Sequence, residues 1–443
     1  MYWQKELETM EDARIRRLQL KRLRETVRAA SRSTFYRERF QQLGLSPEDI
    51  CTLDSLRKLP FTTKNDLRQA YPFGFLAVPK GRVVRMHAST GTTGRSTVVF
   101  YTRADLDQWT DLVARCMVMT GARQGDVFQN MTGYGLFTGG LGFHYAAERL
   151  GIFTIPIGSG NTRRQIHMMR EFETTVIHCI PSFALYMVHS LQAMGIDPRR
   201  DLPLRIAFLG AEPHSEHVRR KVEELYGVDA FNSYGLSEMY GPGVAFECPA
   251  KDGMHLWEDA YLPEIVDPGT GEPVEDGAKG ELVLTSLGRE AMPLLRYRTG
   301  DLTAFCTGEC GCGRRHRRIR RIIGRADDMF IIKGVNIFPT QVEEALLGME
   351  EVGNNYQIIL KRKDYTDIMT VTVEVQERFF RGDPQEREQL RRRMAKRLRE
   401  ELLVTPDIEL LKPGALESTG GKAVRVVDKR DIYEGGISDT KQQ

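Results

Sequence analysis

The sequence lacks a long hydrophobic stretch. No uninterrupted apolar run approaches the ~18 residues that a helix needs to cross a bilayer. Residues 1–25 carry charges throughout, where a signal peptide would have a short apolar core. These absences argue against a membrane partner and against secretion, so the sequence predicts a cytoplasmic protein.

Cysteine and net charge are also scarce. Seven cysteines in 443 residues do not make a disulfide scaffold, and their odd number fits a reducing compartment. The 63 Lys and Arg residues nearly balance the 60 Asp and Glu residues, which leaves a net charge of +3. A nucleic-acid coat or an acidic-lipid binder is usually more lopsided. The basic run at 313–321 is short and poor in aromatic residues, so we expect a solvated edge and no nucleic-acid partner.

The chain is long enough for two or three domains. From about residue 80 to 300, short apolar runs such as TVIHCIPS and LRIAFLGAE alternate with helical patterns. This alternation is typical of βαβ units and of mostly parallel sheets. After about residue 325 the pattern is typical of a compact α+β domain. We therefore predict an α/β fold with a large multi-sheet domain at 1–326 and a small α+β domain at 327–443. Apolar positions at helical spacing in the first thirty residues predict a surface helix docked on the large domain.

A loop rich in glycine and hydroxyl residues, MHASTGTTGRST, occupies residues 86–97. The glycines let the backbone bend and expose N–H groups, and the hydroxyls add further donors, so the loop suits the oxygens of a polyphosphate. Its spacing does not fit the Walker pattern. The candidate phosphate-binding residues are Ser89, Thr90, Gly91, Thr92, Thr93 and Gly94.

This loop resembles the signature of adenylate-forming enzymes, the superfamily of acyl-CoA synthetases, peptide-synthetase adenylation domains and luciferases. Further segments like the motifs of that superfamily follow in order: GAEP (210–213), YGLSE (234–238), YRTGD (297–301), GRADD (324–328) and GGK (420–422). Longer segments look like the patterns of phenylacetate–CoA ligases, among them 133–151, 247–259, 310–318 and 324–346. The resemblance covers essentially the whole chain. It implies a large nucleotide-binding domain followed by a small mobile domain.

The resemblance implies a reaction in two halves. The carboxylate of an acid attacks the α-phosphorus of ATP to give an acyl-adenylate and pyrophosphate, and the thiol of coenzyme A then displaces AMP. The implied protein is an AMP-forming aryl-acid:CoA ligase, with phenylacetate first among its substrates. One alternative is an enzyme that loads an aromatic acid onto a carrier-protein thiol. Another is a catalytically silent binding protein, against which the presence of Lys422, Glu238 and Asp301 argues. The resemblance also suggests a homodimer.

The resemblance assigns roles to particular residues. Glu238 is the candidate Mg²⁺ ligand beside the phosphates. Lys422 would bridge the attacking carboxylate and the α-phosphate. Asp301 would accept hydrogen bonds from ribose hydroxyls, and Arg325 would contact ribose or phosphate. Asp327 looks like the hinge about which the small domain rotates between the half-reactions. The remaining candidates for nucleotide binding are Gly210, Ala211, Glu212, Asn232, Ser233, Tyr234, Gly235 and Ser237.

A pocket for the acyl group is also implied. We expect an aromatic wall with space left by glycines, on which an aromatic acid can stack. Its candidate residues are Tyr134, Phe137, Gly139, Gly140, Ala211 and Pro213. His214 stands where phenylacetate–CoA ligases usually carry Trp, which leaves open a hydroxylated, indole or benzoate-like acid.

Three of the seven cysteines crowd into positions 306–312. Cys310 and Cys312 are too close along the chain for a relaxed disulfide, and in a reducing compartment they favour a metal. Two ligand sets of three sulfurs and one nitrogen are open, and both favour structural Zn²⁺. The local set is Cys306, Cys310, Cys312 and His316. The resemblance to phenylacetate–CoA ligases favours the other set, which is Cys248, His255, Cys310 and Cys312.

Overall fold

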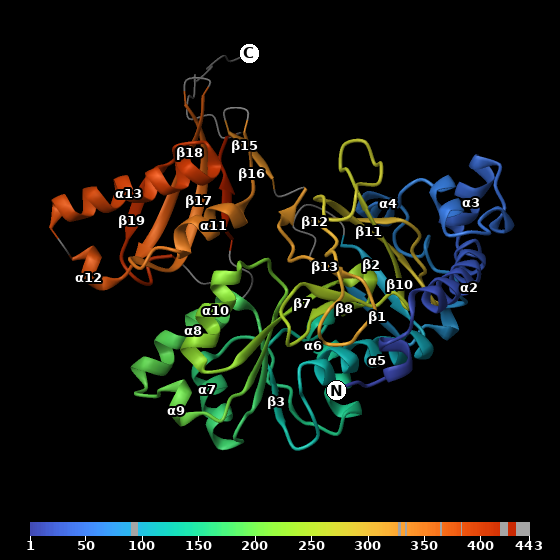
Figure 1. The fold of residues 1–443 in the computed structure, drawn as a ribbon, viewed down its shortest axis with the longest axis horizontal. Coiled ribbons are helices and arrows are strands. Elements are labelled where there is room, and N and C mark those ends of the chain that lie inside the picture. The colour runs from blue at the N-terminus through green and yellow to red at the C-terminus, as the bar shows by residue number, and fades with distance from the viewer. Residues whose placement is uncertain are drawn as a thin grey trace, which may run out of the picture. The chain divides into compact units, whose positions relative to one another are not determined.

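The computed structural model describes residues 1–89, 96–326, 329–332, 335–363, 366–381, 383–416 and 424–430. The chain divides into two compact units (Figure 1). Unit 1 comprises Met1–Glu212 and Arg219–Ala326, and unit 2 comprises Pro213–Val218 and the described residues after Ala326. Within the described residues, no helix has the length and apolar character required to span a bilayer.

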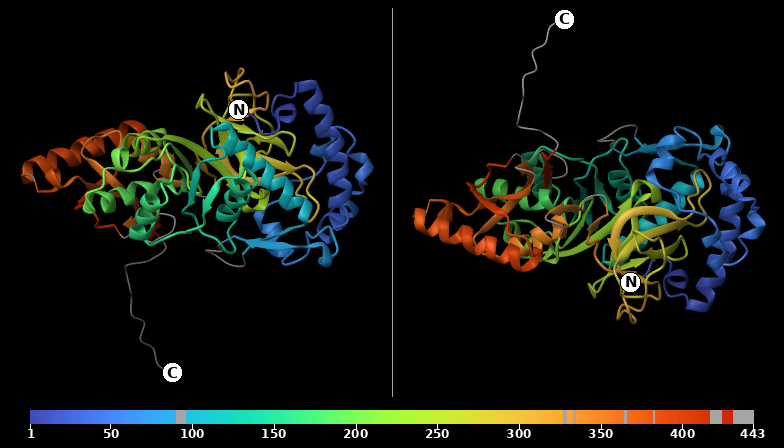
Figure 2. Two further views of the ribbon diagram at one scale, coloured as in Figure 1. Left: turned by 90° about the horizontal axis from the view of Figure 1, so that it is seen from below. Right: turned by 90° about the horizontal axis from the view of Figure 1, so that it is seen from above.

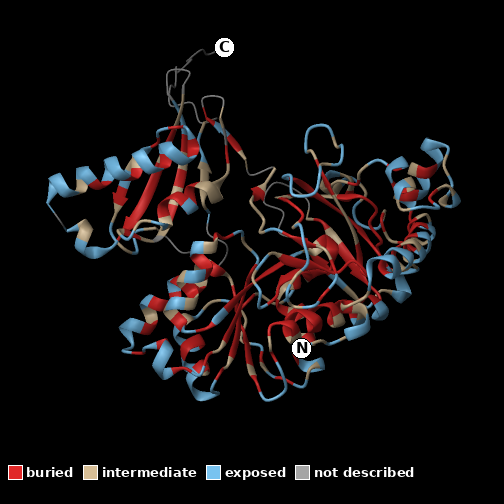
Figure 3. Cartoon of the chain, viewed as in Figure 1, coloured by how far each residue is buried: buried red, intermediate tan, exposed pale blue. Residues whose placement is uncertain are grey.

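Unit 1 is built on an eight-stranded sheet with the strand order β13-β9-β8-β7-β6-β5-β3-β4. Its strands are β3 (Val127–Asn130), β4 (Phe153–Ile155), β5 (Val176–Cys179), β6 (Ile206–Gly210), β7 (Asp229–Leu236), β8 (Gly241–Glu247), β9 (Met254–Leu256) and β13 (Arg318–Ile319). Strands β4, β3, β5, β6 and β7 run parallel, and the apolar strands β5 and β6 are buried along their whole length. Figure 3 shows buried residues, in red, along the strands of unit 1.

The prediction of mostly parallel sheets is right for these strands and wrong for the rest of unit 1. Strands β7, β8, β9 and β13 pair antiparallel. Only residues 237–240 separate β7 from β8, and a parallel partner needs a crossover of about a dozen residues. A second sheet, β10 (Tyr261–Val266), β11 (Gly280–Ser286), β12 (Tyr297–Thr303) and β14 (Gly324–Arg325), is also antiparallel, as is the pair β1 (Arg85–Ala88) and β2 (Val98–Tyr101).

Helix α5 (Arg103–Met119) leads into β3, and further helices connect the parallel strands. These are α6 (Thr138–Arg149), α7 (Thr162–Glu171), α8 (Pro181–Ala193), α9 (Pro198–Asp201) and α10 (Glu216–Tyr226). Helix α5 begins at a capping box, in which Thr102 accepts from the N–H of Asp105 and the Asp105 carboxylate accepts from the N–H of Thr102. The N-terminal part adds α1 (Lys5–Glu8), α2 (Asp12–Ala30), α3 (Thr34–Leu43) and α4 (Lys64–Gln69), with short 3₁₀ turns η1 (Pro47–Asp49), η2 (Asp54–Lys58) and η3 (Lys80–Arg82).

The predicted N-terminal surface helix is α2. Its residues Leu23, Val27 and Ala30 are fully buried in the core of unit 1, while Arg24 and Arg28 between them are exposed. Figure 2 shows this helix, in blue, along an edge of unit 1. The spacing of apolar residues therefore predicted both the helix and its buried face.

Unit 2 contains a four-stranded sheet with the order β19-β18-β17-β20, in which only β17 and β18 are antiparallel neighbours. Its elements are β15 (Phe330–Ile332), β16 (Val335–Ile337), α11 (Pro339–Leu347), β17 (Val352–Lys363), β18 (Thr366–Val375), α12 (Glu377–Phe380), α13 (Pro384–Leu402), β19 (Asp407–Leu411) and β20 (Val426–Asp428). Helix α13 buries an apolar residue every fourth position, Leu390, Met394, Leu398 and Leu402, so one stripe of this highly charged helix enters the core of unit 2.

Candidate active site and candidate metal centre

The predicted nucleotide and acyl residues of unit 1 follow the carboxyl ends of parallel strands. Tyr134 follows β3, Ala211 follows β6, and Glu238 follows β7 in the short turn η4 (Ser237–Met239). Strand β3 has β4 on one side and β5 on the other, so the strand order reverses there. In open α/β sheets ligands bind beside the carboxyl ends of the strands at such a reversal. The topology therefore brings these three segments to one edge of the sheet.

The backbone after β6 is constrained. A Cβ at Gly210 would lie 2.7 Å from the carbonyl oxygen of Ser233 on β7, so only glycine permits the close approach of these strands. The next residue, Ala211, is exposed and adopts a left-handed conformation with φ of 69°. Non-glycine residues rarely adopt this conformation, and such strain is concentrated at functional sites. The Glu212 carboxylate accepts a hydrogen bond from the Ser182 N–H at the start of α8, at 2.7 Å.

Glu238 is joined to the base of the glycine-hydroxyl loop. Its side chain is buried, and its Oε1 accepts a hydrogen bond from Thr97 Oγ1 at 3.1 Å. Thr97 Oγ1 also lies 2.6 Å from Ser89 Oγ, and the Ser89 N–H donates to the Thr97 carbonyl at 3.0 Å. Both ends of the loop are thus fixed to each other and to Glu238. The loop residues Thr90, Gly91, Thr92, Thr93 and Gly94 lie outside the described residues.

Asp301, on β12, is held by residues from two other motifs. Tyr234 donates to Oδ2 at 2.6 Å, and Arg325 donates from Nη1 to Oδ1 at 3.0 Å. Arg325 is the register partner of Asp301 across β12 and β14. Burial, and then the Asp301 carboxylate, raise the pKa of Tyr234 well above its usual value, so its hydroxyl stays a donor. The motifs YGLSE, YRTGD and GRADD therefore meet at one carboxylate.

The other residues predicted around β7 contact the neighbouring strand β8 or helix α6. A Cβ at Gly235 would lie 1.8 Å from the Gly241 carbonyl oxygen, which makes glycine obligatory. Asn232 and Ser233 are buried, and the Asn232 N–H donates to Glu247 Oε2 at 2.8 Å. Ser237 Oγ lies 3.4 Å from Thr138 Oγ1 at the start of α6. These contacts tie the YGLSE segment to its neighbouring elements.

The candidate acyl residues of unit 1 differ in what they offer. Tyr134 is half-buried, its hydroxyl accepts from Asn130 Nδ2 at 3.2 Å, and burial raises its pKa to about 12. Phe137 is 45% exposed, which leaves its ring available to a ligand. Gly139 has ordinary room around its Cα, whereas a Cβ at Gly140 would lie 2.6 Å from the Gly133 carbonyl oxygen. Gly140 therefore permits close packing and does not open space. Pro213 belongs to unit 2, and Asp327 and Lys422 lie outside the described residues.

Two residues of this site lie in the predicted motifs but were given no role from the sequence. Thr97 is the last residue of the glycine-hydroxyl loop, directly before β2. Tyr297, the first residue of YRTGD, is buried, and its pKa is raised well above the usual value by burial and by the charge of Glu238. Only the folded arrangement reveals that both residues lie close to Glu238.

Cysteine and histidine side chains gather at a second place in unit 1. The ligand atoms of Cys248, His255, Cys310 and Cys312 all lie within 4.8 Å of one another. Cys248 Sγ is 3.5 Å from Cys310 Sγ, and Cys312 Sγ is 3.2 Å from His255 Nε2. None of the seven cysteines, all within the described residues, forms a disulfide. The structure thus assembles the set that joins two distant segments.

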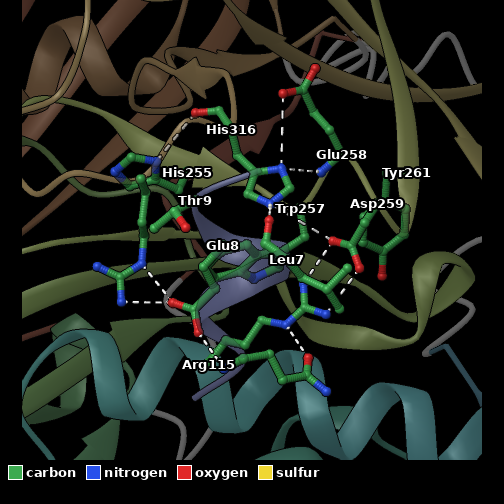
Figure 4. Close-up of polar contacts among 12 residues, drawn as sticks. Leu7, Glu8, Thr9, Arg115, His255, Trp257, Glu258, Asp259, Tyr261 and His316 are labelled. Atoms are coloured by element: carbon green, nitrogen blue, oxygen red, sulfur yellow. Dashed lines mark hydrogen bonds and ion pairs between the residues drawn. The ribbon is translucent and has the colours of Figure 1, made fainter. Parts of the chain in front are cut away.

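The local ligand set is not assembled. Both ring nitrogens of His316 are engaged by the backbone, because Glu258 N–H donates to Nδ1 at 3.1 Å and Nε2 lies 3.0 Å from the Leu7 carbonyl oxygen (Figure 4). Cys306 is outside the group of converging ligand atoms. The His316 carbonyl oxygen instead lies 3.3 Å from His255 Nδ1, which orients the imidazole with Nε2 toward Cys312.

The chemistry of this group suits a soft divalent metal. A hydrogen bond from Cys248, followed by the contact with His255, holds the pKa of the Cys312 thiol well below its usual range. The same hydrogen bond holds the pKa of Cys248 well above its usual range. Four sulfur and nitrogen ligands around one point, one of them a cysteine whose thiol has a lowered pKa, fit a tetrahedral zinc ion.

The residues next to the cysteine–histidine group anchor the N-terminal segment. Tyr2 donates to the Cys312 carbonyl oxygen at 3.0 Å, and Arg314 forms a buried ion pair with Glu8 at 2.7 Å. Nearby, Arg115 makes a two-pronged ion pair with Asp259, at 2.7 and 2.9 Å (Figure 4). In each of these pairs the guanidinium and the carboxylate are hydrogen-bonded to each other, and buried charges are normally tolerated when they are paired in this way.

Comparison with known proteins agrees with this architecture. Residues 79–289 match the family of AMP-binding enzymes, and residues 334–430 match the AMP-binding enzyme C-terminal domain. The chain superposes with a TM-score of 0.92 on 2-hydroxyisobutyryl-CoA ligase in its postadenylation state, at 29% identity over 98% of this chain and 93% of that one. The fold and its motifs thus define an adenylate-forming enzyme of the AMP-binding class.

Two relatives identify the family within this class of enzymes. Over 97% of its length the chain is 46% identical to the whole of phenylacetate–coenzyme A ligase from Thermus thermophilus. It is 41% identical to the enzyme of that name from Escherichia coli K12, over 96% of this chain and 97% of that one. The chain belongs to the phenylacetate–coenzyme A ligase family.

Proposed function

We propose that this protein catalyses the AMP-forming ligation of an aryl acid to coenzyme A, and that phenylacetate is its preferred acid. The observation that carries the proposal is the connected set at the sheet edge, in which the base of the glycine-hydroxyl loop bonds to Glu238 through Thr97. A phosphate-binding loop fixed to a buried carboxylate provides both donors for a triphosphate and an oxygen ligand for its metal ion. The chemistry of the named relatives supports the same reaction.

In this proposal most of the residues act directly on ATP or on the acid, and Tyr234 and Arg325 act through Asp301. Glu238 would hold Mg²⁺ together with phosphate oxygens, and the bound ion would neutralise charge on the triphosphate. Asp301 would accept from the ribose hydroxyls, and Tyr234 and Arg325 keep its carboxylate oriented. Tyr134 and Phe137 would form one wall for the aromatic ring of the acid. Lys422 would bridge the acid carboxylate and the α-phosphate.

We further propose that the small domain is mobile and rotates about Asp327 between the two half-reactions. The relative 2-hydroxyisobutyryl-CoA ligase has been solved in a postadenylation state with an acyl-adenylate. It has also been solved in a thioesterification state with the adenylate and CoA. A rotation of this kind would withdraw Lys422 after adenylation and admit the thiol of coenzyme A.

The direct test is pyrophosphate release measured across a panel of aryl acids, with and without coenzyme A. We expect phenylacetate-dependent release and formation of phenylacetyl-CoA. Absence of release with every acid would contradict the proposal. Release that coenzyme A does not convert to thioester, while a carrier protein does, would instead identify an enzyme that loads a carrier.

We also propose that Cys248, His255, Cys310 and Cys312 bind one structural zinc ion. Four protein ligands would fill the coordination sphere, so the ion would fasten the loop after β8 to the segment before β13 without taking part in the reaction. The lowered pKa of the Cys312 thiol and the orientation of His255 support this assignment.

Two cysteine variants separate the competing ligand sets. Cys306→Ser is expected to keep about one equivalent of zinc. Cys312→Ser is expected to fall below about 0.2 equivalents and to melt several degrees lower, because it loses a metal that only the folded state binds tightly. Zinc content is measured by elemental analysis after dialysis. Loss of metal from the Cys306→Ser protein would contradict the assignment.

We also propose that the protein is located in the cytoplasm and forms a homodimer. A reducing compartment keeps the four metal ligands as thiols and imidazole, which the zinc assignment requires. Size-exclusion chromatography with light scattering tests the dimer.

A further inference from the structure

Arg289, which follows β11, is a buried cation that the sequence motifs do not explain. It is 1% exposed. Its Nη1 donates to the main-chain carbonyl oxygen of Glu238. Its Nε and Nη2 have no hydrogen-bond partner within the part of the chain that the structure describes, and no carboxylate there forms an ion pair with it.

Aromatic rings replace the missing solvent around this guanidinium. Its Cζ lies 4.6 Å from the ring centre of Tyr240 and 5.5 Å from that of Tyr101. Both distances are within the range in which ring faces attract a cation. The two rings are also tied together, because the Tyr101 hydroxyl donates to the Tyr240 carbonyl oxygen at 3.2 Å. Arg289 is therefore held between the rings and the turn that carries Glu238.

Asp105 fixes this arrangement from the first turn of α5. Its carboxylate accepts from the Tyr240 hydroxyl at 3.1 Å, and from the N–H groups of Glu290 and Ala291 at 2.8 and 3.0 Å. The same carboxylate thus positions the Tyr240 ring against the guanidinium. It also fixes the backbone that directly follows Arg289. Asp105 is 1% exposed, so these bonds are shielded from water.

A role in packing alone does not account for such a residue. A buried N–H group without an acceptor destabilises the folded state, and a hydrophobic side chain would fill the space without that cost. The hydrogen bond that Arg289 does make is directed at a strained turn. Tyr240, two residues after Glu238, has a backbone φ of 78°, which residues other than glycine rarely adopt.

We propose that Arg289 is a positioning residue for Glu238. By holding the carbonyl oxygen of Glu238, it fixes the turn η4 so that the Glu238 carboxylate stays beside Thr97 and the phosphate loop. The consequence is tighter binding of ATP when Mg²⁺ is present, and no direct contact between Arg289 and ATP is needed. This inference rests on the proposed role of Glu238 as the Mg²⁺ ligand.

The test measures how strongly Mg²⁺ and ATP binding are coupled. The dissociation constant of ATP is determined by calorimetry with Mg²⁺ and in magnesium-free buffer prepared without a chelator, so that zinc is retained. The ratio of the two constants is the coupling. We expect Glu238→Gln to bring this ratio close to one and Arg289→Met to lower it about tenfold. Arg289→Lys, which keeps the charge, should restore part of it.

Arg296→Met is the matched control. Arg296 is also a buried arginine stacked on an aromatic ring, at 4.1 Å from the centre of Phe61, but it pairs with Glu264. This variant is expected to lose stability and to keep the coupling ratio. Melting temperatures are recorded for every variant, and Arg289→Lys decides the question if Arg289→Met does not fold.

Several outcomes overturn the inference. One is a coupling ratio within twofold of wild type in the arginine variants. Another is that Arg289→Met lowers the coupling ratio by the same factor in the Glu238→Gln protein as in the wild-type protein. The effects of residues that act as a unit are not additive, so the second substitution should then have a smaller effect. A Glu238→Gln protein that keeps the wild-type ratio would instead refute the proposed magnesium ligand itself.

Discussion

Replacing Glu238 with Gln is expected to lower acid-dependent ATP–pyrophosphate exchange by at least about 100-fold. Gln has nearly the same shape and can still accept the hydrogen bond from Thr97 Oγ1. It has no negative charge, and Mg²⁺ prefers carboxylate to amide oxygen as a ligand in phosphate-binding sites. The variant therefore removes one property, the charge beside the triphosphate, and keeps the packing of a side chain that is 5% exposed.

Glu264→Gln is the control for this experiment. Glu264 is also largely buried and pairs with Arg296 at 3.0 Å, on a strand of the second sheet. We expect this variant to lose stability but to retain exchange within a few-fold of wild type. Exchange by Glu238→Gln at near wild-type rate would exclude the carboxylate from the first half-reaction.

Replacing Lys422 with Ala is expected to separate the two half-reactions. Adenylation should fall by about 1,000-fold, because a cation between two groups of negative charge stabilises the transition state in which they react. Conversion of presynthesised phenylacetyl-adenylate to the thioester should change less than about threefold, since an interaction made only in the first transition state affects only that step. The two rates are measured by pyrophosphate release and by quenched-flow analysis of phenylacetyl-CoA.

Lys429→Ala provides the comparison for Lys422→Ala. It removes an exposed lysine from the same region, directly after β20. Both half-reactions should proceed at wild-type rates in this variant. An equal loss of both half-reactions in Lys422→Ala would argue against a small domain that alternates between two positions.

Much of the architecture could be predicted because local patterns determine it. Apolar runs separated by helical patterns gave the parallel strands β3 to β7, and helical spacing gave α2 and its buried face. The antiparallel sheets were missed because strand direction depends on connection length and on partners far away in the sequence. Four residues between β7 and β8 force a hairpin, yet that short connection is visible only once the ends of both strands are known.

The candidate sites show the same limit. Motifs identified Glu238, Asp301 and Tyr234 because their chemistry requires those residue types at those spacings. The Thr97 hydroxyl contacts both Ser89 and Glu238, and Arg289 contacts one main-chain carbonyl oxygen. No spacing rule identifies a threonine just before a strand or an arginine just after one. The candidate metal ligands were narrowed to two sets, but a choice from the residues alone was not possible, because Cys248 and Cys310 are separated by 62 positions. Tertiary structure excluded His316 by engaging both of its nitrogens.

The docking of the first residues beside the cysteine–histidine group has a practical consequence for how the protein is handled. Tyr2 and Cys312 are separated by 310 positions, so the N-terminal segment cannot dock until most of the chain has been synthesised. A polyhistidine tag fused to Met1 would then place extra imidazoles next to the proposed zinc ligands, where they compete for the same ion. Metal content and thermal stability are therefore best measured on protein from which such a tag has been removed.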